Sequence, residues 1–414
     1  MELLVGVMVS LVVVAGAIAL LAGQRRSFLS SSGDRAQQET GRMALEEISQ
    51  NLRMAGFGIE PPMVFDFGQM TGVPTDRTPQ SSGRTVTFGG DSAAATGFAC
   101  ATAVTCRDRV DGPDEIAFQY RNPVFNHAIA SFPSANSVVI AGPLNQPIQA
   151  GQVFQAVCYT GNMTWAYLRA SAGVAATDAV QVTIPLENGN QLDYPHQNVL
   201  VDPSTGDTCF RSGQARLMKV DRFRYLIQSY DAGGNVVAWN TAGARPYLML
   251  DRGLRDASGT ALLDVVSPDV EDLQVSYVFP LAPPGMQVAG ATSGTQLTSS
   301  STGIDFAPSG GPPTYATAAL SSVRGTRYPA NIRAVRLAVV VRPPLPNPNR
   351  LTADVTIPAA GNRPALTNGV PGYFRLLFGT SVAVPNMESR APYFPFLGTS
   401  GYAVGADQLN VGGG

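Results

Sequence analysis

The chain has 414 residues, enough for a large core or two domains, and only 14% of them are charged, well below the usual quarter. Its formal net charge is −2, so it lacks the excess of basic residues that binds nucleic-acid phosphates, and we expect no nucleic-acid partner. The 43 glycines and 31 prolines are frequent but fall short of a disordered composition.

The N-terminal segment is apolar over a membrane-length stretch. Residues 3–23 read LLVGVMVSLVVVAGAIALLAG, where Ser10 carries the only hydroxyl. As a helix this stretch would rise about 30 Å, the thickness of a bilayer's hydrocarbon core. No basic residue precedes it, and it is longer than the apolar core of a signal peptide. We therefore predict that residues 1–26 form the transmembrane half of a long helix, with Arg25 and Arg26 at the lipid headgroups.

The next segment, residues 27–60, has the pattern of an amphipathic helix. Apolar residues recur three and four positions apart at Leu45, Ile48, Leu52 and Ala55. Such a stripe faces a core while the opposite side meets water. Gly56 and Gly58 favour an end to the helix, and Pro61 and Pro62 prevent its continuation. We expect residues 27–60 to be the amphipathic half of the same helix, packed under a globular domain.

Residues 61–414 are predicted to form a β-rich domain. Short runs rich in valine, isoleucine, phenylalanine and tyrosine are bounded by turn-forming residues, which is typical of strands. Residues 282–328 break this pattern because they are rich in Ser, Thr, Gly and Pro and nearly uncharged, which indicates a surface excursion between two strands. The predicted strands include DEIAFQYR, NSVVIAG, DAVQVTIPL, RFRYLIQSY, LQVSYVFP, IRAVRLAVVVRP and FRLLFGTSVAV.

The four cysteines are an even set, which suggests disulfides in an oxidising compartment. Cys100 and Cys106 are close enough in sequence to close a hairpin, which leaves Cys158 to pair with Cys209. The alternative is that the thiols are free or bind a metal. No C-x-x-C motif supports a metal, so we predict the disulfides Cys100–Cys106 and Cys158–Cys209.

The sequence offers little catalytic chemistry. It lacks the G-x-S-x-G elbow, the glycine-rich phosphate loop and the H-E-x-x-H motif. His127 and His196, the only histidines, lie beside turn residues and are not at metal-ligand spacing. The acidic cluster from Asp108 to Glu115 lacks the alternation of a calcium loop, and a turn before a strand explains it better. We predict no enzyme activity, and no catalytic, cofactor-binding or metal-binding residues.

Glu2 is an acid at the tip of the apolar segment. A carboxylate there must be paired, protonated or lifted to the membrane interface. Two interpretations stay open on these grounds: an interfacial acid without a special role, or an acid paired with a positive group on a neighbouring helix, such as another chain's amino terminus. Arg25 and Arg26 follow the apolar segment, and by the positive-inside rule they would leave the domain in the cytoplasm. The predicted disulfides instead require an oxidising compartment. We therefore expect positively charged residues upstream of Met1.

Several segments resemble a known family. The opening MELLVGVMVSLVVVAGAIALL is similar to the start of type IV pilins and type II secretion pseudopilins. Five later segments resemble, in the same order along the chain, segments of the PilW family of minor pilins. They are the helix end GRMALEEISQNLRMAGFG and the segments GPDEIAFQYR, DVEDLQVSYVF, NIRAVRLAVVVRP and FRLLFGTSVAVPNMESR. The family's leader and cleavage glycine are absent from the chain as written.

The resemblance implies an α+β, pilin-like fold: a long N-terminal helix packed on a large antiparallel β-rich domain. It implies a structural subunit that primes type IV pilus assembly within a complex at the fibre tip. The implied partners are other minor pilins, the major pilin, a large tip adhesin and, before assembly, lipid. Glu2 would neutralise a neighbouring subunit's amino terminus. The implied location is the bacterial inner membrane with the domain in the periplasm, and later the pilus tip.

Two alternatives remain at this stage. The related minor pseudopilin J of type II secretion has a similar opening helix, but the order of the later segments and the size of the chain favour the pilus branch. A membrane-anchored extracytoplasmic β-domain that binds a ligand or hydrolyses a glycan is the other alternative. That third function would require a pocket with convergent carboxylates.

Overall fold

The computed structural model describes part of the chain, namely residues 2–59, 64–65, 70–71, 99–100, 112–134, 136–158, 164–187, 214–278, 332–346, 355–360, 363, 365–367 and 369–388. About half of these residues lie in strands. The helices are α1 (Glu2–Leu52) and α3 (Pro385–Glu388), and the strands are β1 (Met70–Thr71), β2 (Ala99–Cys100), β3 (Ile116–Ser134), β4 (Ser137–Ala141), β5 (Val153–Cys158), β6 (Thr164–Arg169), β7 (Gln181–Pro185), β8 (Ala215–Tyr230), β9 (Val236–Val237), β10 (Arg245–Arg255), β11 (Ala261–Pro268), β12 (Val270–Val278), β13 (Ala334–Val341) and β14 (Leu376–Ala383).

The strands form two main sheets, and every strand pair in them is antiparallel. The larger sheet has nine strands in the order β11-β10-β8-β3-β4-β7, with β5 and β9 also paired to β8, and β6 paired to β5. The smaller sheet has the order β12-β13-β14. The chain passes from one sheet to the other at Asp269, which has a positive φ of 59°. This single residue therefore makes the corner between β11 and β12.

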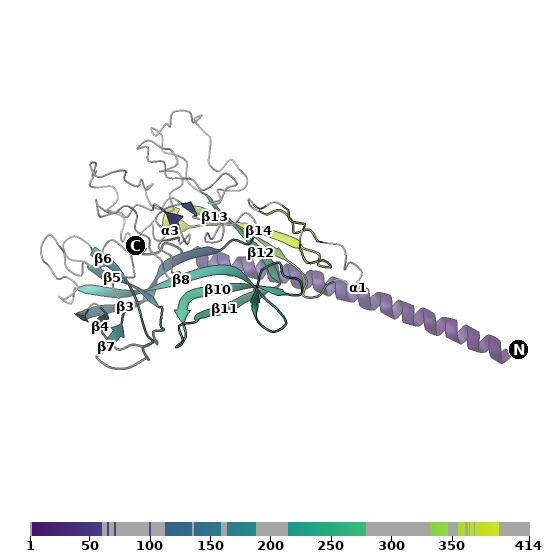
Figure 1. Ribbon diagram of the computed structural model, residues 1–414, viewed down its shortest axis with the longest axis horizontal. Helices are drawn as coiled ribbons and strands as arrows, with labels where there is room; N and C mark the ends of the chain where they lie inside the picture. Colours follow the sequence, from purple (N-terminus) through teal and green to yellow (C-terminus); the bar gives the residue numbers. More distant parts are fainter. Residues whose placement is uncertain are drawn as a thin grey trace, which may run out of the picture.

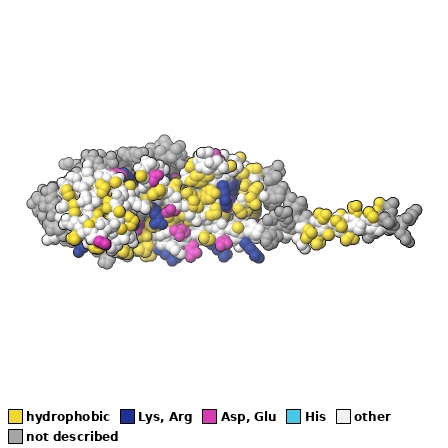
Figure 2. All heavy atoms as spheres, turned by 90° about the horizontal axis from the view of Figure 1, so that it is seen from below, with side chains coloured by type: hydrophobic (Ala, Val, Ile, Leu, Met, Phe, Trp, Pro, Cys, Tyr) yellow, Lys and Arg dark blue, Asp and Glu magenta, His cyan; other side chains and the backbone are white. Residues whose placement is uncertain are grey.

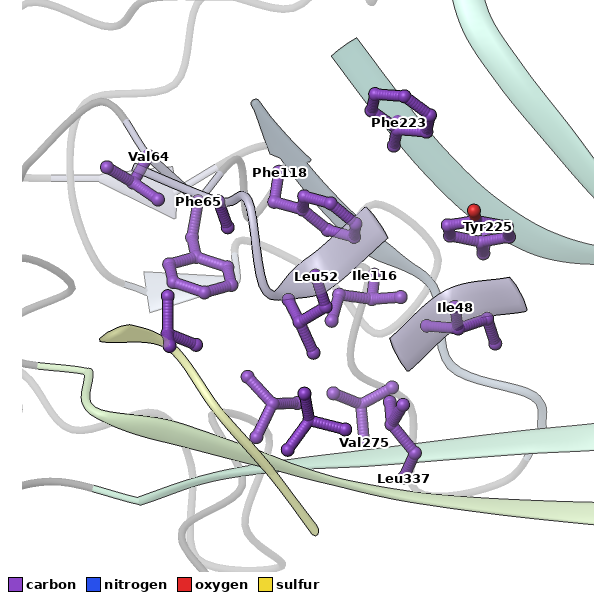
Figure 3. Packing of buried hydrophobic residues seen from close by; sticks show 14 of the residues in the cluster. Ile48, Leu52, Val64, Phe65, Ile116, Phe118, Phe223, Tyr225, Val275 and Leu337 are labelled. Atoms are coloured by element: carbon purple, nitrogen blue, oxygen red, sulfur yellow. The ribbon is translucent and has the colours of Figure 1, made fainter. Parts of the chain in front are cut away.

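The main core lies between the two sheets, and α1 fills it. Figure 3 shows Ile48 and Leu52 between the aromatic side chains of the large sheet and the aliphatic side chains of the small sheet, including Val275 and Leu337. Ile48 and Leu52 are fully buried, at 0% exposure. The stripe predicted from Leu45, Ile48, Leu52 and Ala55 is confirmed, because all four are buried in this cluster.

The helix ends where its glycines predict. α1 stops at Leu52, and a turn carries the chain through Gly56 and Gly58, which have φ values of 82° and 67°. A side chain strains the backbone in that region, so glycine favours the stop. The Gly56 amide then donates to the carbonyl of Gln119 on β3, 3.0 Å away. The turn thereby ties the helix end to the large sheet.

A second, separate core lies in the part of the large sheet away from α1. Its buried members come from β3 to β8 and from the connections at Leu144 and Ile148. Phe154, Ile140 and Leu217 are fully buried in it. Because β3 and β8 each contribute to both cores, these long strands join the two halves of the domain into one sheet.

The structure corrects the predicted α+β, pilin-like fold class. Strands, not a balance of helix and sheet, account for most of the regular structure among the described residues. Moreover, no helix within the described part of the chain is both long and apolar enough to cross a membrane. The predicted division of the chain into residues 1–26, 27–60 and 61–414 stays a prediction.

Candidate functional site

The N-terminal part of α1 projects away from the sheets (Figure 1). We call residues 7–21 the projecting segment. Its large apolar side chains are exposed, among them Leu11 at 66%, Val12 at 70% and Leu20 at 64%. Figure 2 shows hydrophobic side chains along this rod, beyond the mixed surface of the domain. An apolar surface of this kind marks a site of interaction with another protein or with lipid.

The exposed apolar surface surrounds the helix rather than following one face. The consecutive residues Leu11, Val12, Val13 and Val14 are 66%, 70%, 64% and 56% exposed. Successive residues turn by about 100° around a helix, so these four side chains point in all directions. One flat partner surface would cover only some of them. The projecting segment is thus suited to an environment that encloses it, such as a bundle of helices.

Three glycines lie in or beside the projecting segment, and the space next to each of them is open. A Cβ placed on Gly6, Gly16 or Gly23 would meet no atom of the described residues within 4 Å. Glycines on a helix let another backbone approach closely. Their presence here adds sites of close approach to an otherwise aliphatic surface.

The predicted assembly residue, Glu2, is the first residue of α1. Its side chain lies outside the described residues, so its pairing with an amino terminus stays a prediction. The predicted disulfides stay predictions as well. Cys100 ends β2 and Cys158 ends β5, but Cys106 and Cys209 lie outside the described residues. The excursion at 282–328 and His196 also lie outside them.

Asp114, in the acidic cluster before β3, is buried and has a structural role. Asp114 is 1% exposed, and its Oδ2 accepts a hydrogen bond from the amide of Val275, 2.8 Å away. The Asp114 amide donates to the carbonyl of Leu273 at 2.7 Å. Glu115 pairs with Arg224 on β8 at 2.7 Å. Asp114 thus joins the start of β3 to β12, and the predicted turn before the strand lies partly outside the described residues.

His127 is a packed side chain on β3. Its Nδ1 lies 2.8 Å from the carbonyl oxygen of Ala141, and its ring lies 4.5 Å from that of Phe125, measured between centroids. Across the portion of the chain that the structure describes, no group of three or more His, Cys, Asp or Glu residues is arranged to hold a metal ion.

Two buried ion pairs on β12 were not predicted from the sequence. Asp272 accepts a hydrogen bond from Arg363 Nε at 2.7 Å, and Glu271 pairs with Arg375, whose Nη2 lies 2.9 Å from Glu271 Oε1. All four side chains are at most 1% exposed. Burial raises the pKa of Asp272, although the nearby Arg363 acts in the opposite direction.

The two pairs cross long stretches of sequence. They attach the connection between β13 and β14 to β12, about 90 to 105 residues earlier in the chain. The only sequence signal was an acidic triplet interrupted by valine, DVED, at the start of β12. Nothing in that triplet identifies the arginines that bind it.

Comparisons with known proteins give no relative. No protein-family model matches the chain, no curated protein is similar to it, and no solved structure is similar to it.

Proposed function

We propose that the chain is a minor pilin of the PilW type, a structural subunit that primes assembly of a type IV pilus. The observation that carries this proposal is the projecting segment, which exposes apolar side chains in every direction around a helix. A subunit that assembles through a bundle of helices needs such a surface.

In this proposal the two ends of α1 have different tasks. The C-terminal end is held between the sheets by side chains such as Ile48 and Leu52. The projecting segment joins the equivalent helices of neighbouring subunits. Its apolar surface then exchanges contacts with lipid for van der Waals packing against the other helices. The domain is carried on the outside of the fibre.

The partners and location follow from the resemblance and are part of the proposal. The partners are other minor pilins, the major pilin and a large tip adhesin. Before assembly the subunit resides at the bacterial inner membrane with its domain in the periplasm, and afterwards it lies at the pilus tip. Glu2 at the start of α1 would pair with a neighbour's amino terminus, by the same resemblance. The minor pseudopilin J of type II secretion remains the alternative subunit type.

The proposal can be tested by placing a charge in the projecting segment. Val13, at 64% exposure, would be replaced in the Val13→Asp variant, and the variant would replace the native chain in the producing cell. We expect a folded domain but a loss of pilus assembly, measured by counting surface fibres and by immunoblotting sheared fibres. A buried aspartate in a helix bundle is strongly unfavourable.

The matched control is Val180→Asp, because Val180 is also an exposed valine, at 84%, but lies in the domain next to β7. It should leave assembly unchanged. Normal fibres with Val13→Asp would contradict the proposal. Normal fibres combined with a loss of type II secretion would instead favour the pseudopilin.

A further inference from the structure

The point where α1 leaves the domain is marked by one buried polar side chain. Gln37 is 1% exposed, whereas its neighbour Gln38 is exposed. On α1, the apolar cluster begins only at Ala44. Gln37 therefore lies about one helical turn N-terminal to Gly41, which approaches Phe378, and almost two turns N-terminal to Ala44.

Gln37 binds both ends of one connection. Its Nε2 donates to the carbonyl of Val341, 3.2 Å away, and to the carbonyl of Phe374, 2.7 Å away. Val341 is the last residue of β13, and Phe374 lies two residues before β14. The side-chain amide of Gln37 thus joins the helix, through two hydrogen bonds, to the start and the end of the β13–β14 connection.

The hydrogen bonds of the Gln37 side chain indicate that it positions the helix more than it stabilises the fold. Its Oε1 is buried and accepts no hydrogen bond from the described residues. A buried acceptor without a partner is unfavourable, and an apolar side chain of similar size would avoid that cost. The two donated bonds are directional, whereas apolar contacts would allow the helix to slide or rotate.

The two described ends of the connection that Gln37 binds are themselves held by side-chain contacts. Its last part carries Arg375, which pairs with Glu271 on β12 and also donates to the carbonyl of Val370 at 2.8 Å. Its first part carries Arg342, which is stacked on Tyr373 with 4.3 Å between the guanidinium carbon and the ring centroid. The two carbonyls that receive the Gln37 amide are consequently fixed relative to the small sheet.

We propose that Gln37 is a polar latch that fixes where, and in which direction, α1 leaves the domain. The projecting segment, residues 7–21, moves as a separate rod, and residues on the C-terminal side of the latch move with the sheets. The latch is independent of the proposed function, because it rests on contacts within one chain.

Hydrogen–deuterium exchange of the full chain in detergent tests the latch. In the native chain, the amides of residues 38–43 should be protected, and protection should fall on the N-terminal side of Gln37. The Gln37→Met variant removes both donors at similar volume. It should make residues 38–43 exchange about tenfold faster, as expected for the loss of one to two hydrogen bonds, while the amides from Ala44 to Leu52 keep their protection.

Gln38→Met is the matched control, because it makes the same substitution at the adjacent exposed position, and it should leave the exchange of residues 38–43 unchanged. Equal exchange in the two variants would overturn the latch. If Gln37→Met does not fold, the pattern of amide protection in the native chain tests the latch instead. Protection that begins by residue 38 supports the latch, and protection that begins only at Ala44 overturns it.

Discussion

At the scale of single residues, the ion pairs on β12 stand out because acidic and basic side chains are buried together. Glu271 and Arg375 are each 1% exposed. Removal of one partner from such a pair leaves the other charge buried and uncompensated, which costs more than the pair itself contributes. By contrast, Arg252 and Asp264 form a pair at 3.4 Å whose side chains are 46% and 66% exposed.

We predict that Arg375→Leu lowers the free energy of unfolding by about 3–5 kcal/mol, because it strands the Glu271 carboxylate. The control Arg252→Leu should change it by no more than about 1 kcal/mol. Urea unfolding of the two variants measures the difference. The double variant Glu271→Leu with Arg375→Leu should recover part of the loss, and a double variant as unstable as the sum of two independent losses would contradict this account.

Tyr225 provides a pH-dependent residue in the main core. Its side chain is fully buried, and Asn51 of α1 donates to its hydroxyl at 2.8 Å. Burial is the main cause that raises the Tyr225 pKa, and the carboxylate of Glu47 raises it further. The folded chain therefore keeps this phenol protonated at a pH where the unfolded chain ionises it.

A raised pKa in the folded state contributes stability that is complete below the ordinary tyrosine pKa of about 10 and is lost as the pH rises above it. We predict that the free energy of unfolding falls above about pH 10 more steeply in the native chain than in Tyr225→Phe, which has no proton to lose. Urea unfolding across this range measures both slopes. Parallel curves would show that Tyr225 does not contribute.

At the scale of elements, α1 approaches β14 closely at one glycine. A Cβ on Gly41 would lie 2.4 Å from Cδ2 of Phe378 and 2.9 Å from its Cγ. Both the outer and inner ring atoms are this close, so the whole ring would have to move. By contrast, a Cβ on Gly33 would make only an ordinary contact, 3.7 Å from the Cβ of Pro343.

We predict that Gly41→Ala destabilises the domain by about 1–3 kcal/mol, the usual cost of overpacking, despite the better helix propensity of alanine. Gly33→Ala should be neutral or should stabilise by up to about 1 kcal/mol, because alanine favours the helix and no clash opposes it. Thermal unfolding of the two variants measures the contrast. Equal melting temperatures would mean that Phe378 moves aside at no cost.

At the scale of the whole molecule, the rod and the domain are separable. The main core takes its first residue from α1 at Ala44, and the projecting segment contributes no buried side chain among its described residues. The apolar surface that limits solubility is therefore at one end of the molecule, and the buried surface that stabilises the fold is at the other.

We predict that a chain lacking residues 1–26 folds and stays monomeric in detergent-free buffer, whereas the full chain associates there. Light scattering after size-exclusion chromatography measures the difference. A chain that begins at Ala44 serves as the control, because it lacks Gln37 and Gly41 and should be less stable. Aggregation of the chain without residues 1–26 would show that a second apolar surface exists on the domain.

The sequence by itself determined the local features of this protein. The helical spacing of Leu45, Ile48, Leu52 and Ala55 predicted the buried stripe of α1, and the glycines after it predicted its end. Apolar β-branched runs predicted strands such as β8, β12 and β13. These features are legible because they depend on residues within a few positions of one another.

Only the tertiary structure decided how distant parts meet. The division of the strands into two sheets, the second core and the buried ion pairs all depend on residues far apart in the chain. Glu271 and Arg375, for example, are 104 positions apart. The choice of Gln37 over Gln38 as the buried glutamine likewise depends on where the ends of β13 and β14 lie. Sequence analysis places a charged or amide side chain on the surface, because the partner that allows its burial is known only from the tertiary structure.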